Sequence, residues 1–313
     1  MIKFWIAASR IYTSPMTILS WLVIFCYCLT KDGNVLYGFL ALIGICFAHL
    51  ATNVFDDYID YKKLENTENF KNTKNNKCAY LKEFDKSIDD VLNLFFIYIL
   101  IASSIGLFFL IKIGWGVLIF AGLAGIITLL YPILGKFRLC EIAVALTYGP
   151  LLFGGVYYVM TKSFDINCLI LSVPTMIMTV NLLYTSTIMD FDNDKINGKK
   201  TLANSFETKE KAFDFQKKLI VLGYLSIFLI CIFDISDWEV FLTYLTFPLA
   251  INLTNSLKEY IKNPNYLPKQ RWFNFPMGNF ENNNSASFLF RMFQTRNLMV
   301  YFATILSISL LFD

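Results

Sequence analysis

Acidic side chains gather at the polar ends of two long apolar segments of the chain. The first group follows one of these segments and reads NVFDDYID over residues 53–60. At about 100° per residue on a helix, Asn53, Asp57 and Asp60 share one face, and Asp56 lies at its edge. Like charges on one helix face are destabilising, and a bound cation is the usual reason to keep them. The spacing therefore predicts a cation-binding face at the end of this helix.

A second acidic group, DFDND, occupies residues 190–194 at the end of another apolar segment. Asp190 and Asp194 are four residues apart and share a face, whereas Asp192 points away from it. Carboxylate oxygens suit Mg²⁺, which binds through a few carboxylates and completes its shell with substrate phosphate and water. Two acidic faces at one membrane surface would hold Mg²⁺ against a diphosphate. One group alone would equally fit an ordinary solvated helix end.

The two groups together predict a set of metal ligands and catalytic carboxylates. Because each group lies at a helix end, we expect the fold to depend little on these charges. The expected metal ligands are Asn53, Asp56, Asp57, Asp60, Asp190 and Asp194. The expected catalytic residues are Asp57, Asp60, Asp190 and Asp194.

Basic side chains lie near both acidic groups in the sequence. Lys136 and Arg138 are in a short loop between apolar segments, and Lys195, Lys199 and Lys200 follow the second acidic group. Such residues can neutralise a diphosphate and help it to leave. Each also fits the ordinary excess of Lys and Arg on the cytoplasmic side of a membrane. We expect these five residues to bind the substrate.

The elements that position these residues are long apolar segments. The chain is 56% hydrophobic and only 16% charged, whereas a soluble domain carries roughly 25% charged residues. A helix needs about 20 largely apolar residues to span a bilayer. Lipid cannot hydrogen-bond a free backbone amide, so spanning segments are helices or closed barrels, and these segments lack the alternating polar residues of barrel strands. They are residues 17–30, 35–51, 91–111, 114–132, 142–160, 166–188, 219–233, 240–253 and 298–312.

We therefore predict an all-α, polytopic integral membrane bundle of about nine transmembrane helices, formed by residues 1–313 as a single domain in the lipid bilayer. Nothing in the composition indicates a nucleic-acid partner or an obligate protein partner. Nine helices divide the loops into two sets, and one set contains only Lys31, Lys112 and Lys162 of the 27 Lys and Arg residues. Because Lys and Arg in short loops stay cytoplasmic, we expect a cytoplasmic N-terminus and an external C-terminus.

The order and spacing of the two acidic groups resemble those of the UbiA superfamily of intramembrane prenyltransferases. In that superfamily the first motif begins with Asn and has Asp residues within the next two helical turns, here Asn53, Asp57 and Asp60. The second motif is DxxxD, here Asp190 and Asp194. The resemblance covers nearly the whole chain. It implies nine helices, Mg²⁺ as the cofactor and transfer of a prenyl group from a polyprenyl diphosphate.

Within the superfamily the chain is most similar to 1,4-dihydroxy-2-naphthoate prenyltransferases, which act in menaquinone synthesis. The run DFDNDKINGKKTLA over residues 190–203 resembles a run common in those enzymes, as do residues 148–151 and 155–158 in the fifth helix. The chain departs from their pattern at Thr187 and Met189, where Asn and Arg are frequent. The resemblance implies a small aromatic acceptor and a bacterial cytoplasmic membrane.

The chemistry implied by the resemblance has three parts. Mg²⁺ and basic side chains stabilise the departing diphosphate, the apolar interior keeps water from the allylic cation, and an electron-rich aromatic carbon attacks it. Arg10, just before the first helix, is a candidate to bind an acceptor carboxylate. Other acceptors stay open, namely 4-hydroxybenzoate, haem, a chlorophyllide-type ring or a glycerophosphate lipid. The prenyl chain length, the oligomeric state and the role of the loop 258–296 also stay open.

A membrane transporter that uses carboxylates to bind ions is the alternative from a different class of protein. Transporter sites usually lie near the membrane midplane, on broken helices in repeated halves, whereas these acids lie at helix ends. His49, the only histidine, lies one turn before Asn53 on the same helix. We expect His49 to be packed and hydrogen-bonded and not to bind a metal.

Overall fold

The computed structural model describes residues 2–65, 78–196, 198–278 and 285–312. Within these ranges the chain is helical and contains no strand. A long helix near the C-terminus, α15 (Ala286–Ser309), packs among eight helical runs that are long and apolar enough to cross a membrane. The eight runs are Ile11–Leu29, Val35–Lys63, Ile88–Ile113, Leu118–Phe137, Cys140–Thr161, Ile166–Met189, Lys209–Ile232 and Trp238–Lys262. The predicted all-α membrane bundle is confirmed.

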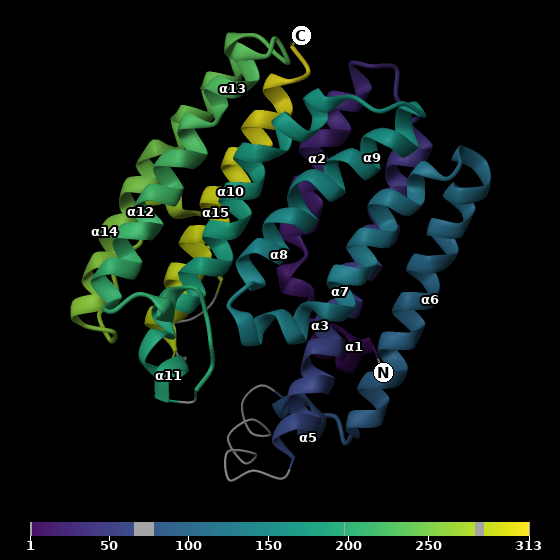
Figure 1. Ribbon diagram of the computed structural model, residues 1–313. Coiled ribbons are helices and arrows are strands. Elements are labelled where there is room, and N and C mark those ends of the chain that lie inside the picture. Colours follow the sequence, from purple (N-terminus) through teal and green to yellow (C-terminus); the bar gives the residue numbers. More distant parts are fainter. Residues whose placement is uncertain (1, 66–77, 197, 279–284, 313) are drawn as a thin grey trace.

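The helices follow the order of the apolar segments along the chain (Figure 1). Besides α15, their bounds are α1 Ile2–Ala8, α2 Pro15–Leu29, α3 Val35–Leu64, α5 Ala79–Glu83, α6 Ile88–Ile113, α7 Leu123–Leu134, α8 Cys140–Leu146, α9 Leu152–Thr161, α10 Ile166–Met189, α11 Phe191–Ile196, α12 Lys209–Leu225, α13 Ile227–Ile232 and α14 Phe247–Lys262. Short 3₁₀ or π-helical segments join or extend them: η1 Ile11–Thr13, η2 Leu118–Gly122, η3 Gly135–Phe137, η4 Thr147–Leu151, η5 Ala203–Ser205, η6 Trp238–Thr246 and η7 Trp272–Asn274.

Polar residues between the apolar segments fix where the long helices begin. The side chain of Asn34 accepts a hydrogen bond from a backbone amide in the first turn of α3. Ser87 and Asp90 form a capping box at the start of α6, and Asp165 caps α10. Each cap satisfies backbone amides that have no partner within the helix. The helices therefore start at sequence positions that their flanking polar residues determine.

α3 continues through the first acidic group, which the sequence placed at a helix end. With 30 residues the helix is about 45 Å long, and residues 53–60 lie inside it. Its last turns are covered by α1 and α5, through a cluster that includes Phe4, Tyr61 and Tyr80. These acids therefore lie on a rigid, packed helix, and the direction of each side chain is set by its position around that helix.

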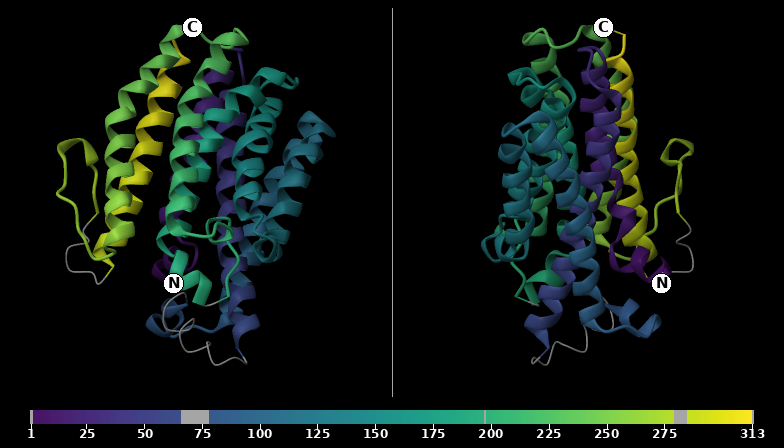
Figure 2. Two further views of the ribbon diagram at one scale, coloured as in Figure 1. Left: turned by 60° about the vertical axis from the view of Figure 1, so that its left-hand side comes forward. Right: turned by 90° about the vertical axis from the view of Figure 1, so that its right-hand side faces the viewer.

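α10 lies at the centre of the bundle, where it packs against α2, α12 and α15 (Figures 1 and 2). α3 packs against both α6 and α7. α6 and α7 follow one another in the chain and yet scarcely touch. The cavity described below lies behind the wall that these two helices form.

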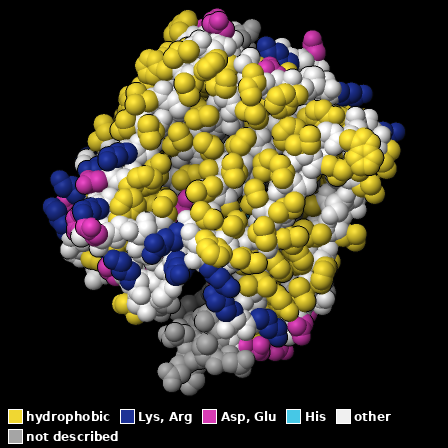
Figure 3. Space-filling model, viewed as in Figure 1, with side chains coloured by type: hydrophobic (Ala, Val, Ile, Leu, Met, Phe, Trp, Pro, Cys, Tyr) yellow, Lys and Arg dark blue, Asp and Glu magenta, His cyan; other side chains and the backbone are white. Residues whose placement is uncertain are grey.

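The two ends of the bundle differ in their polar residues. The beginning of α1 and the end of α15 lie at opposite ends, and α5 and α11 lie at the α1 end (Figures 1 and 2). On the face shown in Figure 3, hydrophobic side chains form a broad band, and Lys, Arg, Asp and Glu gather mainly below it. A surface that faces the hydrocarbon core of a bilayer is expected to look like this band.

The described part of the long loop before α15 is fastened to that helix. Arg291, which is fully buried, donates hydrogen bonds to the backbone carbonyls of Ser256 and Tyr266. Asn297 donates to the carbonyl of Pro276. The bonds to Tyr266 and Pro276 satisfy carbonyls in a stretch without long helices, and the bond to Ser256 links α15 to α14. The loop, to which the sequence assigned no role, packs as part of the bundle.

Candidate active site

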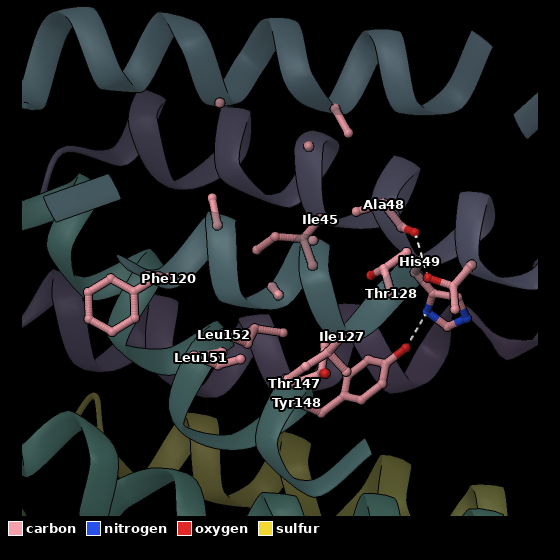
Figure 4. A pocket seen from close by; sticks show the side chains of 18 of the residues that line it. Ile45, Ala48, His49, Phe120, Ile127, Thr128, Thr147, Tyr148, Leu151 and Leu152 are labelled. Atoms are coloured by element: carbon pink, nitrogen blue, oxygen red, sulfur yellow. Dashed lines mark hydrogen bonds between the residues drawn. The ribbon is translucent and has the colours of Figure 1, made fainter. Parts of the chain in front are cut away.

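A cavity of about 650 Å³ lies between α3, α6, α7 and the run from α8 to α9 (Figure 4). This is the size of a small-molecule site. Its walls are mostly apolar, and glycines leave free space in them. At Gly106, Gly122 and Gly125, nothing lies within 4 Å of the place that a Cβ atom would take. Because α6 and α7 both line the cavity and scarcely touch each other, the space between them can receive a long apolar chain.

Polar side chains line the end of this cavity near the connection from α1 to α2. Asn53 and Asp56 lie there on α3, together with Arg10 and Thr13. The Asn53 amide donates hydrogen bonds to the carbonyl of Ser9 at 2.9 Å and to the hydroxyl of Thr13 at 3.1 Å. These two bonds hold the Asn53 side chain at the cavity wall.

The cavity meets only part of the face predicted for the first acidic group. Asp56 accompanies Asn53 on the cavity wall, whereas Asp57 and Asp60 do not line the cavity. Around the helix, Asn53 and Asp56 are about 60° apart, Asp60 projects between them, and Asp57 lies about 40° beyond Asn53 on the other side. The spacing of these residues defines a helix face, but it does not define the side from which a cavity approaches that face.

Asp57 is buried and bound to other protein groups. Its carboxylate accepts hydrogen bonds from Arg10 and from the Tyr80 hydroxyl, the latter at 3.1 Å. Arg10 also lies 3.8 Å from Asp56, so one guanidinium group stands beside two adjacent acids. Arg10 was a candidate to bind the carboxylate of an acceptor. In the structure its guanidinium group already has two carboxylate partners within the chain. Asp57 is fully buried in this ion pair, so we expect the fold to depend on its charge more than a position at a helix end would indicate.

The second acidic group is partly buried where α10 passes into α11. The backbone amide of Asp194 donates to the carbonyl of Asp190 at 2.7 Å, which keeps both side chains on one helical turn. Lys199 Nζ lies 3.6 Å from Oδ1 of Asp194, but the buried Oδ2 atom has no hydrogen-bond partner. Burial raises the pKa of both carboxyl groups, and the charge of Asp194 raises the pKa of Asp190 further.

The other predicted residues near this group face away from it or lie on the surface. Asp192 points outward, as its spacing predicts, and accepts a hydrogen bond from Lys209 at 2.8 Å. The Lys195 ammonium group donates a hydrogen bond to the backbone carbonyl of Glu207 at 3.3 Å. Of the five basic residues that the sequence singled out, Lys199 is the one that lies against an acid of the site. The remaining three are exposed: Lys136, Arg138 and Lys200.

Buried side chains at the start of α8 lie between the two acidic groups. Asp56 from the first group and Lys199 from the second both act electrostatically on Cys140. Glu141 is buried beside it, interacts with Lys199 and with the backbone of Leu202, and has one oxygen without a hydrogen-bond partner. The two acidic groups therefore flank the turn between α7 and α8. Spacing alone could not identify Glu141, because it begins an apolar segment.

The donor atoms at this place fit Mg²⁺ in type. In the part of the chain that the structure describes, no three His, Cys, Asp or Glu side chains already converge on one point that could hold a metal ion. The available donors are nevertheless carboxylate and amide oxygens, which suit a hard cation. The buried Asp194 oxygen without a donor is the kind of atom that a cation would satisfy. A diphosphate between the two groups would supply the further oxygen ligands that Mg²⁺ commonly uses.

Comparison with known protein families decides the class of this membrane protein. The model of the UbiA prenyltransferase family matches residues 18–277. The chain belongs to the UbiA prenyltransferase family. The protein is therefore an enzyme that transfers prenyl groups, and the transporter alternative is set aside. No curated protein sequence gives a significant match to the chain.

Three solved structures share the fold of this UbiA prenyltransferase over nearly its whole length. A UbiA homologue from Aeropyrum pernix K1 is 13% identical with a TM-score of 0.66, covering 95% of this chain and 97% of that one. A digeranylgeranylglyceryl phosphate synthase is 16% identical with a TM-score of 0.59, covering 100% and 99%. A UbiA homologue from Archaeoglobus fulgidus, bound to GPP and Mg²⁺, is 14% identical with a TM-score of 0.58, covering 97% and 99%.

A hydrogen-bonded network extends the polar wall of the UbiA prenyltransferase deeper into the cavity. His49 Nε2 lies 2.8 Å from the Thr13 hydroxyl. Its Nδ1 lies 2.5 Å from the Thr17 hydroxyl. The same nitrogen lies 2.7 Å from the Tyr148 hydroxyl (Figure 4). The prediction that His49 is packed and hydrogen-bonded is confirmed. Tyr148, which sequence analysis noted only as part of a resemblance, reaches His49 across 99 residues of chain.

A local irregularity of the fifth helical run positions Tyr148. The residue lies in η4, a π-helical turn in which Gly149 departs from helical backbone angles and Pro150 interrupts the hydrogen-bond ladder. π-Helical turns within α-helices are frequent at functional sites. A side chain at Gly149 would come within 3.0 Å of Met176, so this turn packs tightly against α10. The sequence Tyr148-Gly149-Pro150 is the signal that could have marked the irregularity.

Proposed function

We propose that this UbiA prenyltransferase transfers a prenyl group from a polyprenyl diphosphate to a small aromatic acceptor, 1,4-dihydroxy-2-naphthoate, in a reaction that requires Mg²⁺. The observation that carries the proposal is the cavity, which has Asn53 and Asp56 at one end and apolar walls beyond them. An amphiphilic substrate with a charged head and an apolar tail matches this division of the cavity.

The acids of the two groups are proposed to hold the diphosphate end. Asp56 and Asp60 on α3 and the pair of Asp190 and Asp194 after α10 would bind Mg²⁺, with the Asn53 amide beside them. Mg²⁺, when bound, neutralises the diphosphate and makes it a better leaving group. Asp57 is proposed to act through Arg10, whose guanidinium group it holds at the cavity end.

The remaining side chains are proposed to assist departure of the diphosphate and to protect the reacting carbon. Lys199, which lies against Asp194, would stabilise the negative charge of the leaving group. The exposed basic residues would attract the diphosphate from solution: Lys136, Arg138, Lys195 and Lys200. The apolar walls exclude water, which would otherwise capture the allylic cation.

The choice of acceptor rests on sequence resemblance. Residues 190–203, 148–151 and 155–158 resemble those of 1,4-dihydroxy-2-naphthoate prenyltransferases. A glycerophosphate lipid is the second candidate, because one of the similar structures is a digeranylgeranylglyceryl phosphate synthase. Membranes containing the protein, given a prenyl diphosphate and both acceptors together, should form prenylated naphthoate as the main product detected by mass spectrometry.

Removal of divalent metal is expected to abolish prenyl transfer. Carboxylates and one amide are the proposed ligands, and they favour Mg²⁺ with Mn²⁺ as a substitute. After exhaustive EDTA treatment the rate should fall to background, and added Mg²⁺ or Mn²⁺ should restore it. Zn²⁺, which prefers nitrogen and sulfur ligands, is the control and should restore much less. Undiminished transfer in EDTA would contradict the proposed chemistry.

We also propose that residues 1–313 act as a single domain in a bacterial cytoplasmic membrane, with the N-terminus cytoplasmic and the C-terminus outside. The basis is the clustering of Lys and Arg in one set of loops. Cysteine labelling at each terminus of the protein in intact and in opened cells should report the two termini on opposite sides. Labelling of both termini from the same side would refute this topology.

A further inference from the structure

The polar network below the carboxylates has hydrogen-bonding features that the proposed diphosphate site does not use. Its members come from four elements: Thr13 from η1, Thr17 from α2, His49 from α3 and Tyr148 from η4. Thr13, His49 and Tyr148 line the cavity, whereas Thr17 is fully buried behind them. Tyr148 is therefore the hydroxyl next to Nδ1 of His49 that a bound molecule can reach.

The protonation of His49 follows from its partners. The Thr13 hydroxyl has one hydrogen, which it donates to the Arg10 carbonyl at 2.9 Å, and it accepts a hydrogen bond from Asn53. Its contact with Nε2 of His49 can then only be one in which Nε2 donates. The neutral ring consequently carries its hydrogen on Nε2, and Nδ1 presents a lone pair.

That lone pair faces more donors than it can satisfy. The hydroxyls of Thr17 and Tyr148 both lie within hydrogen-bond distance of Nδ1, and an imidazole nitrogen has a single lone pair in the ring plane. When Tyr148 donates to Nδ1, its own oxygen keeps lone pairs directed away from the ring. The Thr17 hydroxyl interacts with one of these lone pairs, and the Tyr148 oxygen can accept a second hydrogen bond from a hydroxyl group in the cavity.

The depth of the network matches the place of the second substrate. His49 lies four residues before Asn53 and seven before Asp56, hence about 6 and 10 Å deeper along α3. If the diphosphate lies at Asp56, the prenyl carbon bonded to it points into the cavity, and the acceptor must meet that carbon beside the tail. Thr128 and Thr147 also line the cavity, but their hydroxyls do not act as bases.

We propose that Tyr148 binds a hydroxyl group of the prenyl acceptor and passes its proton to Nδ1 of His49 as the new bond forms. The inference rests on the proposed prenyl transfer and specifies its acceptor as a hydroxyl compound. Tyr148 touches the substrate, and His49 is a positioning residue that acts through Tyr148.

The step balances in atoms and electrons. The acceptor O–H bond breaks as the Tyr148 oxygen takes its proton, and the Tyr148 proton moves to Nδ1. The electron pair left on the acceptor forms the new bond to the prenyl carbon, either from oxygen or from a ring carbon conjugated with it. The bond from that carbon to the diphosphate breaks, and its electron pair leaves with the diphosphate. A prenylated ring carbon then loses its hydrogen as a proton to the departed diphosphate, or its carboxyl group as CO2. The electron pair of the broken bond returns to the ring, and the ring oxygen takes the proton back from His49 through Tyr148.

The test compares variants of the full-length protein in lipid nanodiscs with Mg²⁺, geranylgeranyl diphosphate and three hydroxyl acceptors: 1,4-dihydroxy-2-naphthoate, 4-hydroxybenzoate and glycerol 1-phosphate. Tyr148→Phe should lower kcat/KM for the acceptor by about tenfold or more and leave KM for the prenyl diphosphate unchanged. Tyr158→Phe is the matched control, because Tyr158 is on the next helix and does not line the cavity. It should behave as wild type.

His49→Asn separates proton transfer from packing. Asn can still form a hydrogen bond to Tyr148 but cannot take up a proton, so kcat should fall by about tenfold or more while KM for the acceptor stays near wild type. A ring-halogenated acceptor with a more acidic hydroxyl should recover part of that loss. An equal rise of both KM values, or no recovery with the acidic acceptor, would indicate a purely structural role and overturn the inference.

Two outcomes separate this inference from the proposed function. The inference alone would be overturned if the wild-type protein binds geranylgeranyl diphosphate with Mg²⁺ but the Tyr148→Phe and Tyr158→Phe variants have the same kcat/KM for the acceptor. It would also be overturned if the wild-type protein binds geranylgeranyl diphosphate with Mg²⁺ and transfers its prenyl group to none of the three hydroxyl acceptors. A wild-type protein that neither binds the prenyl diphosphate nor transfers its prenyl group would overturn the proposed function and this inference with it.

Discussion

Replacing Asp190 with Asn is expected to lower the rate of prenyl transfer about a hundredfold or more. Asp190 shares a helical turn with Asp194, and the two partly buried carboxylates offer oxygen atoms to a cation. The amide keeps the size of the side chain but removes its charge, so the protein should still insert and fold. The rate is measured with saturating acceptor, and the melting temperature of the variant is measured in parallel.

Asp192→Asn is the matched control for this prediction. Asp192 is two residues away, exposed and paired with Lys209, and an exposed ion pair contributes about 1 kcal/mol or less to stability. Its replacement should change the rate less than about threefold. If Asp192→Asn is as harmful as Asp190→Asn, the argument from helix faces is wrong.

Asp56→Asn and Asp57→Asn are expected to fail in different ways although the residues are adjacent. Asp56 lines the cavity, so its replacement should lower the rate about a hundredfold with little change in stability. Asp57 is buried and paired with Arg10 and Tyr80. Its replacement should lower the free energy of unfolding by about 2 kcal/mol. This loss is smaller than that for breaking a fully buried ion pair, because Arg10 is partly exposed and stays near Asp56.

The double variant of Asp56 and Asp190 provides the second part of this test. If both acids hold the same metal and diphosphate, the double variant should be no slower than the slower single variant. Rate losses that multiply would show that the two groups act independently. Equal stability losses for Asp56→Asn and Asp57→Asn would contradict the assignment of one acid to the cavity and the other to the packed interior.

The fold could be predicted from the sequence because hydrocarbon restricts the choice of structure. Apolar segments about 20 residues long must be helical, and polar residues such as Asn34 and Asp165 mark where they begin. The α15 helix was expected to start near residue 298 and begins at Ala286. Its first turns contain Arg291, which backbone carbonyls satisfy in the interior, so hydropathy alone places this boundary too late.

The candidate site was only partly accessible from the sequence, for geometric reasons. Helical periodicity separates Asp192 from Asp190 and Asp194, because all three lie within one short segment. It could not decide between Asp56 and Asp57, since the cavity side of α3 depends on how α6 and α7 pack against that helix.

Contacts between residues far apart in the sequence could not be predicted from any local sequence pattern. Tyr148 and His49 meet across 99 residues, and Glu141 is buried where it interacts with Lys199 from beyond the second acidic group. Neither residue belongs to a repeated spacing. Residues 66–77 and 279–284, which the sequence places in loops, lie outside the described residues.

We propose that the two acidic groups hold one diphosphate at the polar end of one cavity. A structure of the protein with Mg²⁺ and geranylgeranyl thiodiphosphate, an unreactive analogue of the donor, tests it most directly. We expect the diphosphate between α3 and α11, metal-bound oxygens from both Asp56 and Asp190, and the tail in the cavity behind α6 and α7. A diphosphate held by only one acidic group, or a tail outside this cavity, would contradict it.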